Sequence, residues 1–476
     1  MKKNHPILEN LAEQYCGEKF LKISQLPLSG SNRLYFRFIF QNHESIIGVY
    51  NEDIQENRAF FHFQKALHKN RIHVPKLLAI SENQQYYLLH DLGDENLFSL
   101  LSTHRNHDII DDKVVEFYQK TVKILPHIQT IDKEIDFSYC YPRNSFDRQS
   151  MQWDLNYFKY YFIKLLNIPF HEQKLEDDFN TLINFLLEAD SHYFLYRDFQ
   201  SRNIMIHDND PYFIDFQGGR KGALQYDVAS LLYDGKANLS ESLRIKLLDL
   251  YLEELVKICP VTKMEFLKYY YSFVLIRILQ AMGTYGFRGY YEKKAHFLAS
   301  IPFAIDNIRY LLENVDFQVQ LPELFSVLER ITQLDIFQPI DNQENILTVI
   351  VNSFSYKSGI PLDLSTNGGG FVFDCRALPN PGREVEFQQL TGKDALVIEC
   401  LEKYEETTAF KHHSFALIDA SIKNYLDRKF TRLMVSYGCT GGQHRSVYFA
   451  ESLDKHLADF FPQIKIILNH KNKFVI

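Results

Sequence analysis

The stretch that most constrains this chain is residues 194–216, FLYRDFQSRNIMIHDNDPYFIDF. Asp198 and Asn203 are separated by four residues, and Asp215 follows a short apolar run. The flanking residues alternate as short strands around a polar turn, which predicts that the three oxygen-bearing side chains meet at one end of a hairpin. Phosphoryl transfer needs one carboxylate to orient the attacking hydroxyl, plus an amide and a second carboxylate to hold Mg²⁺ against nucleotide phosphates. The joint spacing therefore predicts a phosphotransferase site.

The segment before residue 100 alternates like the strands of a sheet. A small-residue turn begins at Gly30 between two apolar runs, and Arg37 follows it on a strand. Backbone N–H groups of such a turn can approach phosphate closely, but a plain hairpin has the same pattern. A helix over 54–69, which holds Glu56, precedes a strand over 86–92 that leads into a hinge suited to adenine. The candidate nucleotide-binding residues are Gly30, Ser31, Asn32, Arg33, Leu89 and Asp91.

After residue 110 the pattern is mainly helical. Arg277 and Gln280 share one helical face in an expected substrate wall, where a structural salt bridge and a substrate contact both explain the arginine. Residues 285–289 are expected to break that helix into a loop. Five strand-like runs followed by a helical half predict an α+β fold, with a bilobal protein-kinase-like domain over 1–316 and the nucleotide between its lobes. Helices are expected over 111–130, 151–167, 173–189, 240–258, 263–283 and 290–314.

A second domain is expected after a helical linker over 317–345. Residues 346–476 predict a smaller α/β domain, in which two strands are followed by the strand, glycine loop and helix of TRLMVSYGCTGGQHRSVYFAESL. Glycines before a helix N-terminus let successive N–H groups surround an oxyanion. The expected phosphate-binding or sugar-phosphate-binding residues are Thr440, Gly441, Gly442, His444, Arg445, Asp374, Arg376 and Asn380.

The same loop allows a different chemistry. Cys439 and Arg445 are five residues apart, the spacing of a thiolate nucleophile and its phosphate-binding arginine in cysteine-based phosphatases. Gly438 precedes the cysteine and no partner acid is evident, so the anion-binding interpretation is favoured.

Composition limits the partners and the compartment. A chain of 476 residues suggests two or three domains. Residues 346–476 hold 15 Lys and Arg against 14 Asp and Glu, so the net charge of −8 comes from the first 345 residues and RNA binding has little electrostatic support. The six cysteines show no metal-type pairing, and no 18-residue apolar span occurs. A cytoplasmic protein without a membrane partner is expected.

The segments 30–37, 87–94 and 196–217, with Tyr226-Asp227-Val228-Ala229 behind them, resemble the aminoglycoside/choline-kinase-type phosphotransferases, and among these the amino-sugar kinases. The resemblance covers roughly residues 20–315. It implies that Asp198 is the catalytic base, that Asn203 and Asp215 bind Mg²⁺, and that Asp227 braces the catalytic loop. ATP and Mg²⁺ are the implied cofactors, and a sugar or amino sugar resembling N-acetylmuramate or N-acetylglucosamine is the implied acceptor.

Two residues depart from that family. Tyr196 stands where a histidine usually precedes Arg-Asp, and the strand over residues 46–50, IIGVY, lacks the usual nucleotide-binding lysine. Without that cation, ATP binding depends on Arg33, Arg37 or metal. A domain that binds nucleotide without catalysis therefore stays open.

The runs LTVIVNSFSYKSGIP, FDCRALPNP and GCTGGQHRSVYFAESL resemble the RapZ C-terminal domain of the RNase adapter family. That resemblance implies a domain that senses an amino-sugar phosphate and engages RNA or an RNase. Two hypotheses follow: a sugar kinase with a fused sugar-phosphate-binding domain, or a non-catalytic nucleotide-binding adapter that engages RNA or an RNase.

Overall fold

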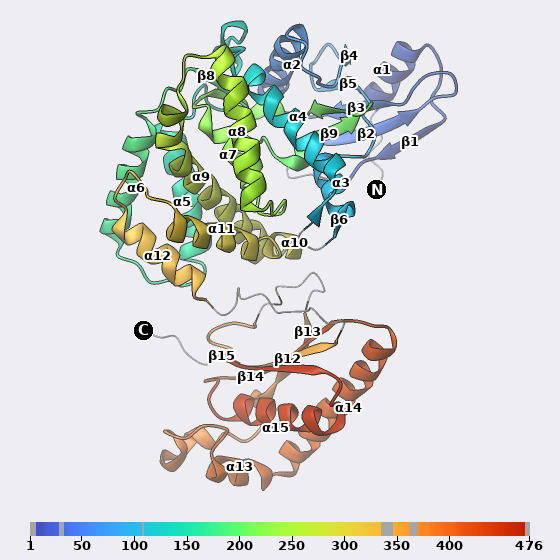
Figure 1. The fold of residues 1–476 in the computed structure, drawn as a ribbon. Helices are drawn as coiled ribbons and strands as arrows, with labels where there is room; N and C mark the ends of the chain where they lie inside the picture. Colours follow the sequence, from blue (N-terminus) through green and yellow to red (C-terminus); the bar gives the residue numbers. More distant parts are fainter. Residues whose placement is uncertain are drawn as a thin grey trace. The chain divides into compact units, whose positions relative to one another are not determined.

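The computed structural model describes residues 6–27, 33–106, 109–334, 346–361, 363 and 369–471. The chain divides into two compact units, one of Met1–Glu292 with Ser300–Phe337 and the other of Lys293–Ala299 with Gln338–Ile476 (Figure 1). No helix among the described residues is long and apolar enough to cross a membrane. The predicted α+β organisation, a sheet lobe and a helical lobe followed by a smaller α/β unit, is confirmed.

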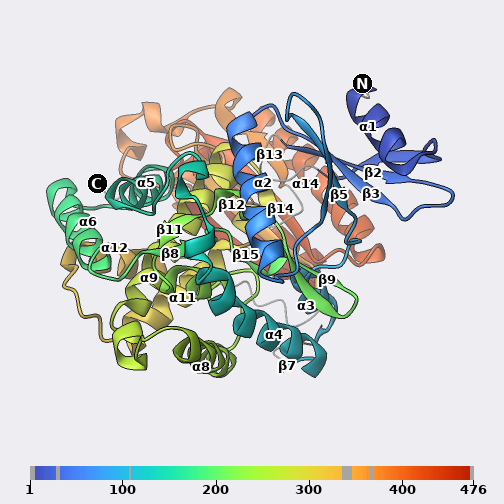
Figure 2. The same cartoon turned by 90° about the horizontal axis from the view of Figure 1, so that it is seen from above.

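The first lobe is an antiparallel sheet with strand order β1-β2-β3-β5-β4. Alternate residues of β5 face opposite sides, so Leu88 packs in the cluster under helix α1 whereas Tyr87 contacts Phe60 of helix α2. Figures 1 and 2 show α1 and α2 on opposite sides of β3 and β5. The bounds are α1 (Pro6–Cys16), β1 (Lys22–Gln25), β2 (Leu34–Ile39), β3 (Ile46–Tyr50), α2 (Ile54–Lys69), β4 (Leu77–Ile80) and β5 (Tyr86–His90).

The second lobe is helical, and α9 is its central element. The helix packs against α5, α7 and α11, and most of its side chains between Ser272 and Gly283 are buried. The helices are α3 (Leu97–Thr103), α4 (Asp112–Gln129), α5 (Arg148–Phe158), α6 (Glu172–Leu186), α7 (Gln225–Leu232), α8 (Glu241–Ile258), α9 (Lys263–Tyr285), α11 (Ile301–Asn314) and α12 (Pro322–Thr332). The short helix α10 (Ala295–Leu298) is assigned to the other unit.

The expected loop at residues 285–289 is wrong. α9 continues to Tyr285 and passes into a π-helical turn over Gly286–Tyr291. A Cβ at Gly286 would lie 1.9 Å from the carbonyl oxygen of Tyr161, so the glycine permits close packing of the main chain instead of ending the helix. Helix α12, in the segment expected as a linker, packs on α6 and α11 of the first unit, where Asp178 accepts a hydrogen bond from the N–H of Leu324.

The expected hairpin is formed by β9 (Ile204–His207) and β10 (Asp210–Phe213). Asp208 and Asn209 make its turn with positive φ values of 50° and 63°, a conformation that these two residue types tolerate better than most. A second pair, β8 (Tyr193–Leu195) with β11 (Arg220–Gly222), flanks the loop that carries Asp198. The two pairs hold the ends of that loop.

The second unit is a parallel sheet with strand order β13-β14-β12-β15. Every residue of β12 is buried, as expected for a central parallel strand. Because all four strands run the same way, Tyr356, Asp374 and Thr440 follow strand ends at one edge of the sheet. The elements are β12 (Thr348–Ser355), β13 (Gly370–Asp374), α13 (Ala395–Glu402), α14 (Glu405–Asp427), β14 (Arg432–Cys439), α15 (Arg445–Phe460) and β15 (Lys465–Lys471).

Candidate active site and anion-binding loop

The three oxygen-bearing residues of the first unit meet through Asn203. Its Nδ2 donates to the main-chain carbonyl of Asp198 at 2.8 Å and lies 3.4 Å from Oδ2 of Asp215. Asp215 itself has a φ of 68°, and Gln217 Nε2 donates to its Oδ1 at 2.7 Å. Both contacts of Asn203 use its amide nitrogen, which leaves the amide oxygen as the atom available to a cation.

The charges at this point are unbalanced. Burial first, and then repulsion from Asp198, raise the pKa of Asp215, while the Gln217 hydrogen bond and the charge of Arg33 oppose that rise. A divalent cation would relieve the repulsion, and carboxylate and amide oxygens suit a hard cation such as Mg²⁺. In the described part of the chain no three His, Cys, Asp or Glu side chains are grouped as a metal site. The amide oxygen of Asn203 would join Asp215 as the second protein ligand.

Asp227 holds the catalytic loop from behind. The carboxylate is fully buried and accepts the N–H of Tyr196 at 2.8 Å and that of Arg197 at 3.0 Å. Burial nevertheless dominates these hydrogen bonds and raises the pKa of Asp227 to about 7. The expected bracing contact is therefore present, and it ties the loop to α7.

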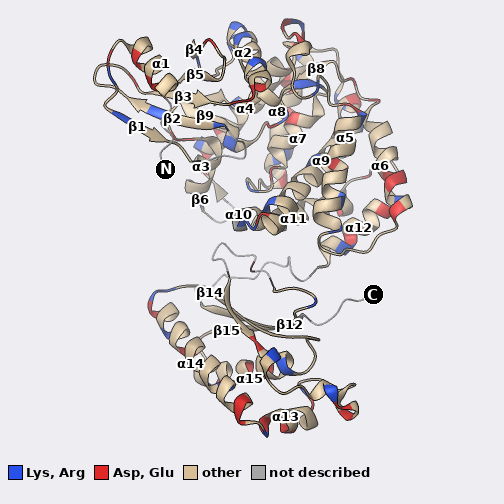
Figure 3. Cartoon of the chain, turned by 180° about the vertical axis from the view of Figure 1, so that it is seen from behind, with Lys and Arg blue, Asp and Glu red and all other residues tan. Residues whose placement is uncertain are grey.

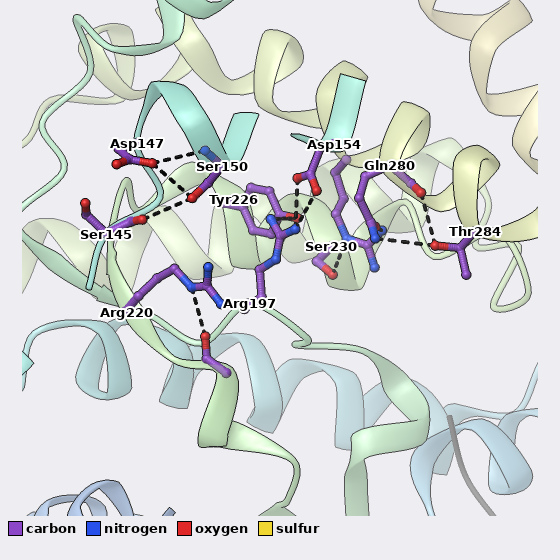
Figure 4. Close-up of polar contacts among 12 residues, drawn as sticks. Ser145, Asp147, Ser150, Asp154, Arg197, Arg220, Tyr226, Ser230, Gln280 and Thr284 are labelled. Atoms are coloured by element: carbon purple, nitrogen blue, oxygen red, sulfur yellow. Dashed lines mark hydrogen bonds and ion pairs between the residues drawn. The ribbon is translucent and has the colours of Figure 1, made fainter. Parts of the chain in front are cut away.

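Arg197, next to the candidate base, points away from it. Figure 4 shows its guanidinium directed at Asp154 and Tyr226. Nη2 lies 2.8 and 2.9 Å from the two oxygens of Asp154, and Nη1 donates to the hydroxyl of Tyr226 at 2.6 Å. Arg197 has a φ of 82°, a costly conformation for a side chain of this kind, and these contacts hold it there. Asp154 was not predicted from the sequence, because its partner is 43 residues away.

Tyr196 replaces the usual histidine with a different contact. Its hydroxyl donates to the carbonyl of Ile214 at 2.6 Å, one residue before Asp215. Burial and the neighbouring carboxylates raise the pKa of Tyr196 well above its ordinary value, so the hydroxyl stays a donor. The substitution thus joins the loop of Asp198 to the segment of Asp215.

The predicted nucleotide-binding residues fall into three groups. Gly30, Ser31 and Asn32 lie outside the described residues. Arg33 is 2% exposed and pairs with Glu56 of α2, with Nη2 3.2 Å from Oε2. Leu89 is a buried residue of β5 at the start of the expected hinge.

Asp91 shapes that hinge through its side chain. Arg37 Nε lies 2.6 Å from Oδ2, the Ser45 hydroxyl donates at 2.7 Å, and the N–H of Gly93 donates at 3.0 Å. Burial opposes ionisation, but these hydrogen bonds hold the pKa of Asp91 below its ordinary value. The carboxylate is therefore committed to the loop, which leaves main-chain groups to meet an adenine ring.

In the second unit, His444 and Arg445 bind main-chain carbonyls of their own unit. Arg445 Nη1 donates to the carbonyls of Arg376 at 3.0 Å and Leu378 at 2.8 Å, and His444 Nε2 lies 2.8 Å from the carbonyl of Phe387. Both side chains are buried. Cys439, considered as an alternative nucleophile, is buried, and its Sγ accepts the N–H of Gly442 at 3.2 Å and lies 3.2 Å from the hydroxyl oxygen of Ser446.

The exposed part of this loop is smaller than the predicted set. Thr440 and Gly441 are exposed, and Gly442 turns the chain with a φ of 69°. Asp374 and Arg376 form a half-exposed ion pair of 2.7 Å at the end of the neighbouring strand β13. Asn380 approaches His444 beside Gly382, where an added Cβ would lie 3.6 Å from Asn380 Oδ1 and 3.2 Å from His444 Nδ1.

The contacts of Arg277 test the salt bridge considered for it. Arg277 Nε donates to the Ser230 hydroxyl at 3.0 Å and Nη1 to Gln280 Oε1 at 2.6 Å, and no described carboxylate lies within ion-pair distance of it. The salt bridge considered for Arg277 is therefore not formed among the described residues.

Figure 3 shows acidic and basic positions interspersed along the helices of the second unit, in keeping with its balanced charge.

Comparison with protein families assigns each unit. Residues 30–261 match the phosphotransferase enzyme family, and residues 347–473 match the RapZ C-terminal domain. Both resemblances expected from the sequence are confirmed. The chain is similar to a nucleotide-binding protein of Macrococcus caseolyticus (strain JCSC5402), 40% identical over 25% of this chain and 38% of that protein. Another, from Psychrobacter sp. (strain PRwf-1), is 32% identical over 37% of this chain and 55% of its own.

The chain thus spans about half or less of the length of these relatives. Among solved structures, the gentamicin complex of APH(2")-IIa is 14% identical, covers 68% of this chain and 99% of its own, and has a TM-score of 0.45. The choline kinase LicA from Streptococcus pneumoniae is 14% identical, covers 63% and 99%, and has a TM-score of 0.40.

Proposed function

We propose that this chain, which joins a phosphotransferase-family domain to a RapZ C-terminal domain, is an ATP- and Mg²⁺-dependent kinase of a sugar or amino sugar. The second unit then binds a phosphate or sugar phosphate. One observation carries the kinase proposal: Asn203 contacts both the catalytic-loop main chain at Asp198 and the carboxylate of Asp215. These contacts of Asn203 support the phosphoryl-transfer role proposed for the three residues.

Each residue has a separate part in the reaction. Asp198 accepts the hydrogen bond of the acceptor hydroxyl and takes its proton as the phosphoryl group is transferred. Asn203 and Asp215 would hold Mg²⁺, which supplies positive charge to the nucleotide phosphates when it is bound. Asp227 and Tyr196 keep the two loops in register, since both bind main-chain groups of these segments.

The second unit supports binding more than catalysis. Exposed groups at the carboxyl edge of the sheet include Thr440, Gly441 and the ion pair of Arg376 with Asp374. N–H groups and a guanidinium are suitable donors for a phosphate. His444 and Arg445 would support this edge from within the unit, because their side chains bind main-chain carbonyls.

The kinase proposal is tested by transfer from labelled ATP to a panel of sugars and amino sugars in the presence of Mg²⁺. Asp198→Asn should abolish transfer while Asp208→Asn should leave it unchanged, because Asp208 is an exposed residue of the turn in the same hairpin. Binding of Mg²⁺-ATP without turnover of any acceptor would instead favour the adapter hypothesis. Lack of both binding and turnover would overturn the nucleotide site itself.

The second proposal has its own measurement. Calorimetric titration of the full chain with amino-sugar 6-phosphates, 1-phosphates and the parent sugars should give heat only with the phosphates, in the absence of ATP. Salt-sensitive binding of RNA with no response to sugar phosphates would favour the adapter.

The six cysteines are all free thiols, which supports a reducing compartment such as the cytoplasm.

A further inference from the structure

Strand β3 has no cation to offer to a nucleotide. It reads Ile46-Ile47-Gly48-Val49-Tyr50, and all but the last residue are buried. Triphosphates are held in this class of site by a cation near the α- and β-phosphates, paired with a carboxylate on the neighbouring helix. The carboxylate is present as Glu56 of α2, so the question is which residue supplies the charge.

Arg37 of β2 is committed elsewhere. Its guanidinium contacts Asp91, lies 2.8 Å from Asp94 Oδ1, and donates to the carbonyl of Gly93 at 3.1 Å. These partners all belong to the hinge after β5. Arg37 therefore fixes the hinge and has no carboxylate partner on α2.

Arg33 lies where the missing side chain would be needed. It directly precedes β2, and the pairing of Leu34 with Tyr50 places it beside the end of β3. Its Nη2 is 3.2 Å from Glu56 Oε2, and its guanidinium carbon lies 6.0 Å from the centre of the Phe60 ring.

The partner carboxylate is held in position by several contacts. Asp53 caps α2 by accepting the N–H groups of Gln55 and Glu56, each at 3.1 Å. Asn51 Nδ2 donates to Glu56 Oε2 at 2.7 Å. One turn further along α2, Phe60 stacks on Phe216 with ring centres 4.9 Å apart and planes 7° apart.

That stacking has a functional consequence because Phe216 follows Asp215. Helix α2 cannot move outward without separating the two rings, so Glu56 and Asp215 keep their relative positions. The ion pair of Arg33 and the metal-binding carboxylate are thus parts of one packed arrangement, with α2 as its support.

We propose that Arg33 supplies the cation that β3 lacks, and that it holds the α- and β-phosphates of a nucleoside triphosphate while Glu56 orients its guanidinium. The inference rests on the proposed function. Arginine suits the task because its planar fork can donate two hydrogen bonds to phosphate oxygens and carries its charge at any physiological pH. The cation would then be an arginine that precedes β2 instead of a lysine on β3, and it would still pair with a carboxylate of α2.

The test separates binding of phosphates from binding of adenine. Affinities for Mg²⁺-ATP and for adenosine are measured by calorimetry in the Asp198→Asn background, so that turnover plays no part. Arg33→Met should weaken Mg²⁺-ATP binding on the order of 10- to 100-fold, the loss of a charged hydrogen-bond pair, and change adenosine binding less than about twofold. Arg33→Lys keeps the charge but not the planar fork, and should restore only part of the Mg²⁺-ATP affinity.

Two control variants lie close by. Arg37→Met should change Mg²⁺-ATP and adenosine affinities in the same proportion, because Arg37 acts on the hinge. Arg58→Met should change neither, because Arg58 is exposed on the same helix as Glu56 and bonds to Gln84. Glu56→Gln should act in the same direction as Arg33→Met, and the double variant should lose less than the sum of the two.

Equal losses of Mg²⁺-ATP and adenosine affinity in Arg33→Met would mean that Arg33 only supports the fold, and would overturn this inference alone. An unchanged Mg²⁺-ATP affinity would do the same. If the parent chain binds adenosine but gains nothing from the triphosphate, no residue holds phosphates and the inference fails. If it binds neither ligand, the proposed function fails with it.

Discussion

In the first unit, burial and the neighbouring Asp198 raise the pKa of Asp215, whereas in the second unit hydrogen bonds from Arg376 lower the pKa of Asp374. The two carboxylates therefore differ in what they lack. Asp215 has an amide donor and a like charge close to it, and it needs a cation. Asp374 already has its cation, and half of that ion pair is open to solvent.

The buried arginines differ in the same way. Arg33 of the first unit pairs with Glu56, a partly exposed carboxylate, while Arg445 of the second unit donates to two main-chain carbonyls. A guanidinium that donates to buried main-chain carbonyls satisfies acceptors that would otherwise lack a donor. Such an arginine stabilises the fold. The buried arginine of the first unit is thus paired with a carboxylate, and that of the second unit with main-chain carbonyls.

Removing the charge of Asp215 is the strongest test of that contrast. Asp215→Asn should lower phosphoryl transfer about 10³-fold, because metal binding supplies several kcal/mol to the transition state. The unliganded chain should become more stable by about 1 kcal/mol, since a repelled carboxylate is removed. Initial rates and urea unfolding measure the two effects, and Asp208→Asn is the matched control. A loss of stability would show that Asp215 supports the fold, against the comparison.

The pH dependence of stability tests whether burial also raises the pKa of a second carboxyl group of the first unit, that of Asp227. Its pKa rises from 3.8 to about 7 in the folded chain, so the folded state holds the proton more tightly than the unfolded state. The contribution of Asp227 to stability should therefore be greatest below pH 4 and fall as the pH rises to 7, by at most about 4 kcal/mol. The fluorescence of Trp153, the single tryptophan and a residue of α5, reports unfolding of this unit. A slope that persists in Asp227→Asn would assign it to other groups.

Much of this arrangement is visible in the sequence where its signal is local. The helix over 54–69 and the glycine loop after β14 were predicted within a residue or two, because turn chemistry and periodicity act over short distances. The polar turn near residue 208 was also predicted, but the strand expected over 193–196 pairs with β11 and not with the strand over 204–207. The pairing of Asp198, Asn203 and Asp215 could be predicted because the three residues lie within one hairpin and its flanks. The prediction that these residues act in catalysis stays a prediction.

The rest depends on contacts between distant segments. Arg197 meets Asp154 across 43 residues, and Arg37 meets Asp91 across 54, and neither pair leaves a pattern in its own segment. The same reason explains why His444 and Arg445 were expected to face a phosphate. A polar residue at the start of a helix has the sequence pattern of an anion ligand. The carbonyls that His444 and Arg445 bind belong to residues 376–387, and only folding brings them close.

Arg445→Met probes the second unit where the contrast predicts a structural loss. Two main-chain carbonyls would lose their donor inside the unit, which should destabilise it by roughly 2–4 kcal/mol. Hydrogen exchange of peptides from β14 measures the effect, and the Trp153 transition of the first unit is the internal control. Loss of sugar-phosphate affinity with unchanged exchange would make Arg445 a ligand and break the comparison.

Arg376→Gln is the smallest change and the one that separates ligand binding from folding in the second unit. Arg376 is half exposed, it stacks 3.8 Å from the centre of the Tyr356 ring, and its ion pair with Asp374 faces solvent. Such a pair contributes little, so unfolding should change by less than about 0.5 kcal/mol. Affinity for the sugar phosphate should nevertheless fall about tenfold, because a charged donor is removed from the exposed edge.

The control for this variant lies at the other edge of the same sheet. Arg428 is exposed at the end of α14, just before β14 begins, whereas Arg376 and Thr440 follow strand ends. Arg428→Gln removes the same charge and should leave the affinity unchanged. Equal losses in the two variants would mean that only net charge attracts the phosphate. Loss of affinity confined to Arg376→Gln would place the anion at the carboxyl edge of the sheet. Arg376 would then bind the anion without supporting the fold, whereas the buried Arg445 supports the fold.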